Sequence, residues 1–490
     1  MTSRAVLPQI ETIVVLMLEN RSLDTMLGWL HSDGRSINLI PRTSLPSRFD
    51  GIGPGDGNSV LGERFAPVRG HEDLGEQRWR VPRQDPAEGL LNVQVQMYGY
   101  DTGHMTDTAW GDHPPMTGFA VDYLNMLPAA LGEVMGAYTR AELPILYGLA
   151  AQFGVSDRWF SSVPTETDPN RCFALCGTSE GKEMDADHPF ACTAPTVFNA
   201  LNASGTPWGI YCQTDFGGFP YVSGRFSYTE MRFAGVRSAL SDPKTVGRIG
   251  PYSDLLNSLR RGDDIPKFCF IEPAWGFGVG DGEGFLGMQG NDYHPPAWVG
   301  PAEDALGELY NALRLSKQWD KMLFVVTFDE HGGSWDHVPP PAAACPDGRI
   351  GLRGFPFTRL GPRVPTLLLS PFVAPRTVFR APLTSTVPFD HTSLLATVLA
   401  WAGVDPAFVA TMGKRVAAAP LFDHALSPVV VQPAPPLIVI PEHFRTQAPI
   451  GPHGLPIDIE DATLQDLREA AAVTHTTSDF IAAIRARRAQ

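Results

Sequence analysis

A seven-residue apolar run near the start of the chain, TIVVLML at Thr12–Leu18, decides the fold. It is rich in β-branched and aliphatic residues without polar alternation, which is typical of a strand buried on both faces of a parallel sheet. The run stops at Glu19 and Asn20. A second run of the same character, MLFVVTF at Met322–Phe328, stops at Asp329 and Glu330.

A third predicted strand and two predicted helices indicate the fold class. RVPTLLL at Arg363–Leu369 predicts a third strand, and apolar residues at helical spacing predict helices over Glu303–Leu315 and His391–Trp401. This alternation favours an α/β protein with a central, mainly parallel sheet between helices. Ligands bind beyond the carboxyl ends of such strands, so we expect the two polar strand ends to be neighbours.

The composition indicates a large folded protein with many loops. The chain has 490 residues, of which 43% are apolar and 19% charged, and this excludes a disordered chain. Its 48 glycines and 45 prolines predict extensive loops, notably Asn38–Arg83 and Trp275–Pro296. A net charge of −15 argues against nucleic acid as a partner, because phosphate neutralisation needs excess positive charge.

The character of the chain changes near residue 405. We expect a catalytic domain over 1–404 and a C-terminal extension over 405–490 that packs on it. The extension has a proline-rich, extended segment at Val429–Pro441 and a pattern of two short helices over Asp461–Arg488. The sequence does not decide the oligomeric state.

Two features bear on the cellular compartment. The six cysteines are scattered without a CxxC pair, which favours a reducing compartment. The apolar run near the N-terminus is short, has acidic neighbours and lacks a cleavage site, so it does not have the pattern of a signal peptide. No run of about 20 apolar residues suggests a transmembrane segment. We therefore expect a cytoplasmic protein, with leaderless export as the alternative.

The two polar strand ends are candidate metal ligands. Carboxylate and amide oxygens from Glu19, Asn20, Asp329 and Glu330, brought to one point, would suit a hard or borderline divalent cation. Either pair alone could equally form a turn or cap a helix. Two such pairs at the ends of buried strands weaken this alternative, and the donor set is compatible with calcium and with zinc.

The segment SSVPTETDPNR at Ser161–Arg171 places Thr167 at an expected helix N-cap, with Pro169 in the first turn. The hydroxyl of Thr167 could simply cap the helix. Alternatively, it could act as a nucleophile on a phosphate held by the helix N-terminus, with a metal ion lowering the hydroxyl's pKa. The local pattern by itself favours the cap.

Four histidines stand beside acidic residues: His294, His331, His337 and His391. A neighbouring carboxylate can fix the tautomer and the orientation of an imidazole ring. Such rings suit metal ligation, proton donation to a leaving oxygen, or contact with an anion. A hydrogen-bonded loop histidine is the alternative in each case.

Two other motif matches lack their structural context. Gly177–Gly181 fits GxSxG, which would make Ser179 an esterase nucleophile, but it follows an expected helix rather than a strand. Gly282, Gly284 and Gly287 fit GxGxxG, but no helix is expected after them. We interpret this second segment as a flexible lid.

Seven motifs in order resemble one known family. They are ENRSLDTMLGWL (from Glu19), PPMTGF (from Pro114), DRWFSSVPTETDPNR (from Asp157), FIEP (from Phe270), NDYHPP (from Asn291), FVVTFDEHGGSWDHVPPP (from Phe324) and FDHTS (from Phe389). The family is that of the phosphoesterases that include non-specific phospholipase C and related acid phosphatases. The resemblance implies an alkaline-phosphatase-like core with long loop insertions.

The resemblance also implies a chemistry. Metal-assisted phosphoryl transfer would use Thr167 as nucleophile and His294 or His331 as proton donor. The implied metal ligands are Glu19, Asn20, Asp329 and Glu330, and the implied substrate contacts are Asn170, Arg171, His337 and His391.

Two departures from the family pattern affect the substrate. Leu23 and Thr25 replace the aromatic residue and the histidine of ENRSFDH, and Glu88 stands where many members have the histidine of DPxH. We expect Glu88 to take over that histidine's place beside the substrate.

The expected function is cleavage of a phospholipid to diacylglycerol and a phosphorylated head group through a phospho-threonine. Apolar loop residues that could line a lipid crevice are Trp275, Phe277, Phe285, Leu286 and Trp298. The close alternative is a phosphomonoesterase of small soluble substrates. A serine esterase using Ser179 and a non-catalytic binding protein are more distant alternatives.

Overall fold

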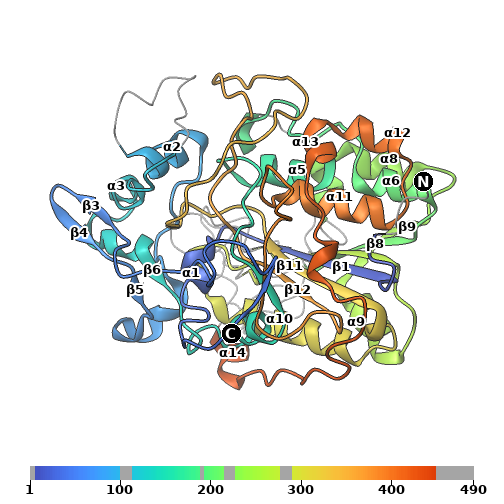
Figure 1. Ribbon diagram of the computed structural model, residues 1–490, viewed down its shortest axis with the longest axis horizontal. Coiled ribbons are helices and arrows are strands. Elements are labelled where there is room, and N and C mark those ends of the chain that lie inside the picture. Colours follow the sequence, from blue (N-terminus) through green and yellow to red (C-terminus); the bar gives the residue numbers. More distant parts are fainter. Residues whose placement is uncertain (1–5, 100–112, 188–191, 214–226, 276–289, 448–490) are drawn as a thin grey trace, which may run out of the picture.

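A nine-stranded sheet crosses the centre of the molecule in the computed structural model, which describes residues 6–99, 113–187, 192–213, 227–275 and 290–447 (Figure 1). The strand order is β2-β13-β7-β12-β11-β1-β10-β8-β9. The strands of this sheet are β1 (Thr12–Leu18), β2 (Asn38–Ile40), β7 (Gly154–Ser156), β8 (Trp208–Cys212), β9 (Gly247–Pro251), β10 (Phe268–Glu272), β11 (Met322–Phe328), β12 (Thr366–Leu369) and β13 (Thr377–Phe379).

The two strands that the sequence marked as buried lie side by side at the centre of this sheet. β1 and β11 pair in parallel with Thr12 opposite Met322 and Leu18 opposite Phe328, and every residue of both strands is buried. Because the strands end in register, Glu19 and Asp329 follow at the same edge. The predicted α/β class and the predicted meeting of the two polar strand ends are both confirmed.

The third predicted strand differs from expectation in length and direction. β12 begins only at Thr366 and runs antiparallel to both of its neighbours, β11 and β7, whereas the other pairs of this sheet are parallel. A fully apolar run does not encode strand direction. The reversal brings Arg363, which precedes β12, to the edge where β1 and β11 end.

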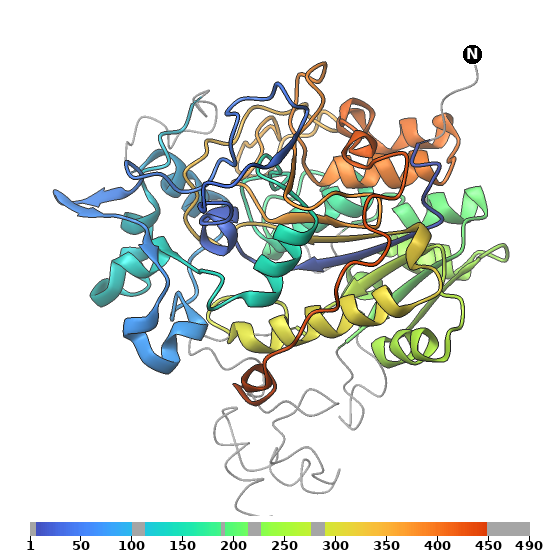
Figure 2. The same cartoon turned by 60° about the horizontal axis from the view of Figure 1, so that its bottom comes forward.

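Helices cover both faces of the sheet (Figure 2), with α10 and α9 on one side and α11 and α5 on the other. α10 begins at Val299 rather than at Glu303, and α11 has the predicted bounds, with Asp390 as its N-cap. The helices are α1 (Leu23–Leu27), α2 (Leu90–Tyr98), α3 (Phe119–Asp122), α4 (Pro144–Gln152), α5 (Thr167–Cys176), α6 (Val197–Ser204), α7 (Tyr228–Arg232), α8 (Ala234–Ser241), α9 (Tyr252–Arg261), α10 (Val299–Leu315), α11 (His391–Trp401), α12 (Pro406–Val409), α13 (Lys414–Ala418) and α14 (Glu442–Gln447).

The segment Asn38–Arg83, expected as loop, contains short regular elements. Besides β2, it forms the hairpin of β3 (Asn58–Val60) and β4 (Glu63–Phe65), strand β5 (Val68–Arg69), which pairs with β6 (Gly136–Ala137), and the 3-10 segment η1 (Glu72–Arg80). The other short 3-10 segments are η2 (Tyr123–Asn125), η3 (Pro128–Met135), η4 (Asp185–Asp187), η6 (Trp319–Lys321), η7 (Ala410–Met412) and η8 (Asp423–Ala425).

The proline-rich segment Val429–Pro441 runs extended along α10. Tyr310, Asn311 and Arg314 of α10 donate hydrogen bonds of 2.8–2.9 Å to carbonyl oxygens of this segment. α14 then packs against the same helix. The two helices expected over Asp461–Arg488 lie outside the described residues, and within the described ranges no helix is long and apolar enough to span a membrane.

Candidate active site

The four predicted metal ligands lie together where β1 and β11 end. Asn20 has a left-handed backbone (φ 55°), and its amide donates to Asp329 Oδ1 at 3.1 Å. The amide of Glu330 donates to the same oxygen at 2.7 Å. Non-glycine residues with positive φ are held in place by their surroundings and concentrate at functional sites. All four side chains are buried.

Gly332 explains how Asn20 is held in this conformation. A Cβ atom at Gly332 would lie 2.1 Å from the Asn20 carbonyl oxygen, and Gly332 itself has φ 59°. Only glycine allows this approach without displacing the turn after β1. The DEHGG segment thereby fixes the ENRS segment, far away in the sequence.

Arg171 of α5 lies between two of these carboxylates. Its Nε donates to Asp329 Oδ2 and its Nη2 to Glu19 Oε1, each at 2.9 Å, and its guanidinium lies 4.7 Å from the ring centre of Trp275. Burial alone would lower the pKa of Arg171, but Asp329 and Glu19 raise it above its ordinary value. Arg171 therefore neutralises and orients two carboxylates, whereas we had expected it to contact the substrate.

The carboxyl groups of Glu19 and Glu330 are buried close to that of Asp329. Burial, then the neighbouring Asp329, raises the pKa of Glu330 and of Glu19 well above the ordinary value. Glu330 Oε1 is fully buried and has no hydrogen-bond partner among the described residues. A buried acceptor without a partner is costly. The donor set of Asn20, Glu330 and their neighbours fits a divalent cation, which would satisfy this oxygen.

Thr167 faces this group from the start of α5. Its hydroxyl donates to Asn20 Oδ1 at 3.4 Å, and 9% of the residue is exposed. The N-cap of α5 is Glu166, so Thr167 is the first residue of the helix rather than its cap. The capping interpretation is therefore wrong, and the hydroxyl bonds to Asn20 instead of to the backbone of its own helix.

Asn170 builds the turn that presents Thr167. It is fully buried, its Oδ1 accepts from the Val163 amide at 3.0 Å, and its Nδ2 donates to the Thr165 carbonyl at 2.8 Å. Both polar atoms of its side chain are hydrogen-bonded to the backbone. The geometry therefore gives Asn170 a positioning role in place of the expected substrate contact.

Two of the predicted histidines are buried beneath the site. His331 Nε2 contacts Gln96 Oε1 at 2.8 Å, and its Nδ1 lies 3.1 Å from Glu330 Oε2. Burial lowers the pKa of His331 to about 3, so it stays neutral and is a poor proton donor. His391, the first residue of α11, donates from Nε2 to the Asp329 carbonyl at 2.5 Å and positions that strand end instead of contacting substrate.

His337 belongs to a separate ion-pair network. It donates from Nδ1 to Asp24 Oδ2 at 2.5 Å, and Arg363 bridges Asp24 and Asp336 at 2.9 and 2.8 Å. Although burial opposes the charge, Asp24 raises the pKa of His337 to about 10. This network joins α1 to the segments after β11 and before β12, so His337 has a structural role here rather than the expected substrate contact.

A second polar group lies next to Asn20, on the exposed side. Asn20 Nδ2 donates to Glu88 Oε2 at 2.5 Å, and Asp85, Glu88 and His294 each offer a ligand atom within 4.8 Å of the others. Burial, followed by the neighbouring Glu330, raises the pKa of Glu88. His294 has 15% of its side chain exposed and His331 none, so of the two predicted catalytic histidines His294 is the one in contact with solvent.

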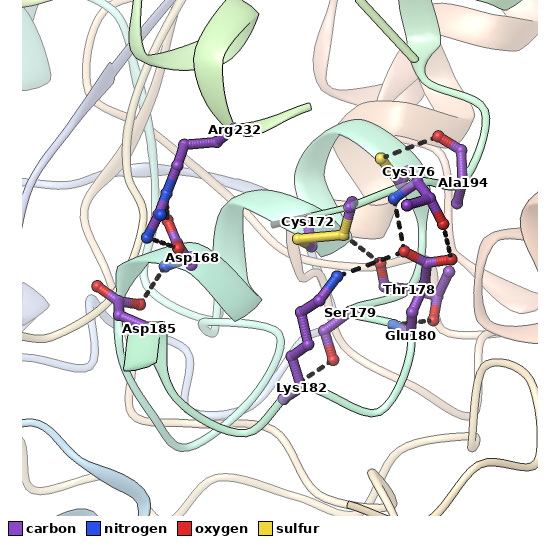
Figure 3. Close-up of a disulfide and its surroundings, with 12 residues drawn as sticks. Asp168, Cys172, Cys176, Thr178, Ser179, Glu180, Lys182, Asp185, Ala194 and Arg232 are labelled. Atoms are coloured by element: carbon purple, nitrogen blue, oxygen red, sulfur yellow. Dashed lines mark hydrogen bonds and ion pairs between the residues drawn. A yellow bond between two sulfur atoms is a disulfide. The ribbon is translucent and has the colours of Figure 1, made fainter. Parts of the chain in front are cut away.

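A disulfide connects the helix of Thr167 to a distant segment (Figure 3). Cys172 in α5 is bonded to Cys192, whose backbone amide donates to the Arg232 carbonyl at 3.2 Å. The side chain of Arg232 in turn pairs with Asp168, next to Thr167. The scattered cysteines gave no sign of this pair. A disulfide is unusual in the reducing compartment that we expected.

Ser179 does not lie on a nucleophile elbow. It follows the C-terminus of α5, is almost fully buried, and donates its hydroxyl to the Lys182 carbonyl at 2.8 Å. The serine esterase alternative is therefore wrong. The glycines of the GxGxxG match, and Phe277, Phe285 and Leu286, lie outside the described residues. Trp275 is buried against Arg171 and Trp298 packs against the core, so both serve internal packing.

The sequence pointed to most of this site but missed Gln96 and the importance of Asp85. Gln96 lies on α2, where its Oε1 contacts His331 Nε2 at 2.8 Å and its Nε2 donates to Asp122 Oδ2 at 2.8 Å. Nothing in the local pattern of α2 marks a glutamine as part of a site. Asp85 could have been found, because it stands three residues before Glu88 in an acidic segment.

The fold and the site define an α/β protein with a carboxylate-rich site at the carboxyl edge of its parallel strands. Comparison with known proteins identifies the particular family. A model of the Phosphoesterase family matches residues 10–405, so the chain belongs to this family and is a hydrolase of phosphoester bonds.

Several characterised proteins are similar to the chain. Non-specific phospholipase C3 of Arabidopsis thaliana is 33% identical over 399 residues, covering 79% of this chain and 69% of that protein. Phospholipase C B of Mycobacterium tuberculosis is 29% identical over 445 residues, covering 81% and 74%. Among solved structures, a protein in the alkaline phosphatase superfamily from Vibrio parahaemolyticus is 15% identical, with a TM-score of 0.32 over 62% of this chain and 67% of that one.

Proposed function

We propose that the protein is a metal-dependent phospholipase C that works through a phospho-threonine. The observation that carries this proposal is the position of Thr167. It is the first residue of α5, and its hydroxyl donates to Asn20 Oδ1 at 3.4 Å, beside the buried carboxylates that follow β1 and β11. The resemblance to non-specific phospholipases C supports the choice of phospholipid as substrate.

The proposed reaction has two steps. Thr167 Oγ attacks phosphorus in line, the bond from phosphorus to the diacylglycerol oxygen breaks, and the phosphorylated head group stays on the threonine. Water then attacks phosphorus and releases the head group as a phosphomonoester, which restores the hydroxyl. A cation held by Asn20, Glu330, Asp329 and Glu19 would lower the pKa of the hydroxyl and neutralise charge on the phosphate.

The remaining side chains have defined tasks in this scheme. Arg171 bonds to Glu19 and Asp329 and aligns them, and Asn170 holds the turn before the nucleophile. His331 is buried, its Nε2 is bonded to Gln96, and burial lowers its pKa to about 3, so it is a poor proton donor. In the simplest form of the mechanism, His294 supplies the proton to the departing alkoxide.

The nucleophile is tested with two variants. Thr167→Ala should lower turnover of phosphatidylcholine by about 10³-fold or more, because it removes the attacking atom, while Thr167→Ser should keep measurable activity. Thr411→Ala is the matched control, because this threonine is exposed and bonds only within its own turn. Turnover by Thr167→Ala at the wild-type rate would refute the assignment.

The substrate class and the intermediate need separate measurements. Phosphatidylcholine and p-nitrophenyl phosphate should be compared with and without chelator, since faster turnover of the monoester would favour the phosphatase alternative. Mass spectrometry after acid quench should find phosphate or a phosphorylated head group on the Thr167 peptide. Full activity in the presence of chelator would contradict the metal requirement.

A further inference from the structure

Four large apolar side chains are exposed on loops at the edge of the sheet that carries the site. They are Leu45 (82% exposed), Ile350 (69%), Leu352 (82%) and Leu383 (64%). Their loops follow β2, β11 and β13, and the strand pairings make all three strands parallel to β1. The loops therefore leave the sheet at its carboxyl edge, where the proposed nucleophile lies. Single exposed leucines are common, whereas several at one functional edge indicate an interaction surface.

Two of these loops are tied together beside the segment that leads to Thr167. Arg380, directly after β13, donates to the Pro46 carbonyl at 2.6 Å and to the Arg48 carbonyl at 2.8 Å. Its guanidinium also donates to Asp157 Oδ2 at 2.7 Å, at the start of that segment. Arg380 is buried, so both loops are anchored to the core while their leucines stay exposed.

The third loop, 349–353, is anchored next to the start of α5. Arg353 Nη1 donates to Asp187 Oδ1 at 2.9 Å. From the same short segment, Asp185 Oδ1 accepts from the Asp168 amide at 2.7 Å, directly after the proposed nucleophile. One short segment therefore connects the exposed isoleucine and leucine of this loop to the nucleophile.

Arginines flank the apolar side chains on two of the three loops. The two sequences are RTSLPSR at 42–48 and RIGLR at 349–353. Arg42 and Arg48 are exposed, and Arg349, also exposed, lies 3.8 Å from Glu180 in an ion pair. Pairs of this kind contribute little energy, so the guanidinium can exchange its partner for a phosphate. These loops thus combine apolar tips with groups that bind phosphate, in a protein whose net charge is −15.

A phospholipid bilayer is the partner whose chemistry matches this combination. Its surface presents phosphate groups over an apolar interior, and the free energy of binding to it grows with the apolar area that is inserted. An anionic bilayer would repel a protein with a net charge of −15. A zwitterionic bilayer has phosphates without net charge, so apolar insertion and local arginine contacts decide the binding.

From this geometry we infer that the loops 41–48, 349–353 and 380–388 form the surface with which the protein docks on a zwitterionic phospholipid bilayer. The inference rests on the proposed function and adds to it the place where the enzyme meets its substrate. The four apolar side chains enter the acyl region, and the arginines contact lipid phosphates. Docked in this way, the edge of the sheet that carries Thr167 faces the bilayer.

The experiment measures binding without chemistry, by sedimentation of the protein with sucrose-loaded phosphatidylcholine vesicles. Leu45→Ser and Leu352→Ser should each lower the partition coefficient about tenfold, because each removes a side chain that is buried on docking. Replacing all four apolar residues by serine should abolish binding. Leu315→Ser is the matched control, because Leu315 is 71% exposed at the end of α10, before the amino end of β11, and it should bind as the wild type does.

Two further variants separate this surface from the proposed chemistry. Thr167→Ala should bind vesicles like the wild type. The fourfold serine variant should hydrolyse monomeric short-chain phosphatidylcholine at the wild-type rate but lose turnover on vesicles, and circular dichroism checks that it is folded. Vesicle binding that depends on the four side chains, in a protein that hydrolyses no phosphodiester, would refute the proposed function and support the surface.

Several results would overturn the docking surface. One is wild-type binding to vesicles by the fourfold variant, and another is an equal loss of binding in Leu315→Ser and Leu45→Ser. Hydrolysis of the monomeric lipid by a wild type that does not bind vesicles would overturn the surface and leave the proposed function. Binding only after phosphatidylserine is added would also overturn it, because the partner would then be an anionic surface.

Discussion

Raising the pH should remove a large part of the stability that His337 provides. Its pKa is about 10 in the folded protein because of Asp24, against an ordinary value of 6.5 when unfolded. A group whose pKa rises on folding stabilises the protein fully below the unfolded pKa, and this stabilisation is lost as the pH rises to the folded pKa. The pH window is therefore 6.5 to about 10.

The difference between the folded and unfolded pKa values of His337 sets the size of this stabilisation. It corresponds to an upper limit of about 5 kcal/mol below pH 6.5, or about 4 kcal/mol at pH 7, falling by about 1.4 kcal/mol per pH unit. Only 19% of the His337 side chain is exposed, so the small values typical of surface ion pairs do not apply.

The assay is urea unfolding of the wild type and of His337→Gln at half-unit steps from pH 6 to 10.5. The difference in the free energy of unfolding should be largest at pH 6 and approach its limiting value near pH 10. His113→Gln, at an exposed histidine, is the control for the general effect of alkaline pH. A wild-type advantage that does not vary with pH would show that His337 is not charged in the network.

Two further predictions concern a glycine and a disulfide close to the site. Gly332→Ala should destabilise the protein and lower turnover, because the new Cβ would meet the Asn20 carbonyl, whereas Gly34→Ala, with a similar φ of 71° and no atom within 4 Å, should cost only about 1 kcal/mol. Equal thermal shifts and equal turnover in the two variants would contradict the close approach. Replacing both Cys172 and Cys192 by serine should lower the free energy of unfolding by about 3 kcal/mol, given the 20-residue separation of the bonded cysteines. Reduction should destabilise the wild type by a similar amount and leave the double variant unchanged, and a wild type insensitive to reduction would show that the disulfide does not form.

The sequence predicted the central strands and the meeting of their ends for a simple reason. Thr12–Leu18 and Met322–Phe328 are apolar throughout, and only a position between two covered faces accommodates such strands. The direction of β12 was not predictable, because burial constrains composition and leaves strand direction to the connections. The short strands within Asn38–Arg83 were not predicted either, because local composition did not indicate them.

The sequence likewise predicted which residues belong to the site but not what each of them does. Residue type marked Arg171, His331 and His337 as functional candidates, but their tasks depend on partners that lie far away in the sequence. Arg171 lies between Glu19 and Asp329, His331 contacts Gln96, and His337 pairs with Asp24. Burial and pairing set the charge of each group, and neither can be derived from a local motif.

The fold class, the family and most of the chemical groups at the site are readable from the sequence, because apolar runs and short polar motifs are local properties of the chain. The packing of remote segments sets which of these groups are exposed, which bond to one another, and which buried acceptors lack a hydrogen-bond partner among the described residues. It placed Thr167 at the first position of α5 and set Asp85, Glu88 and His294 beside Asn20. These relations are distances between remote segments, and they arise only when the sheet brings those segments to one edge.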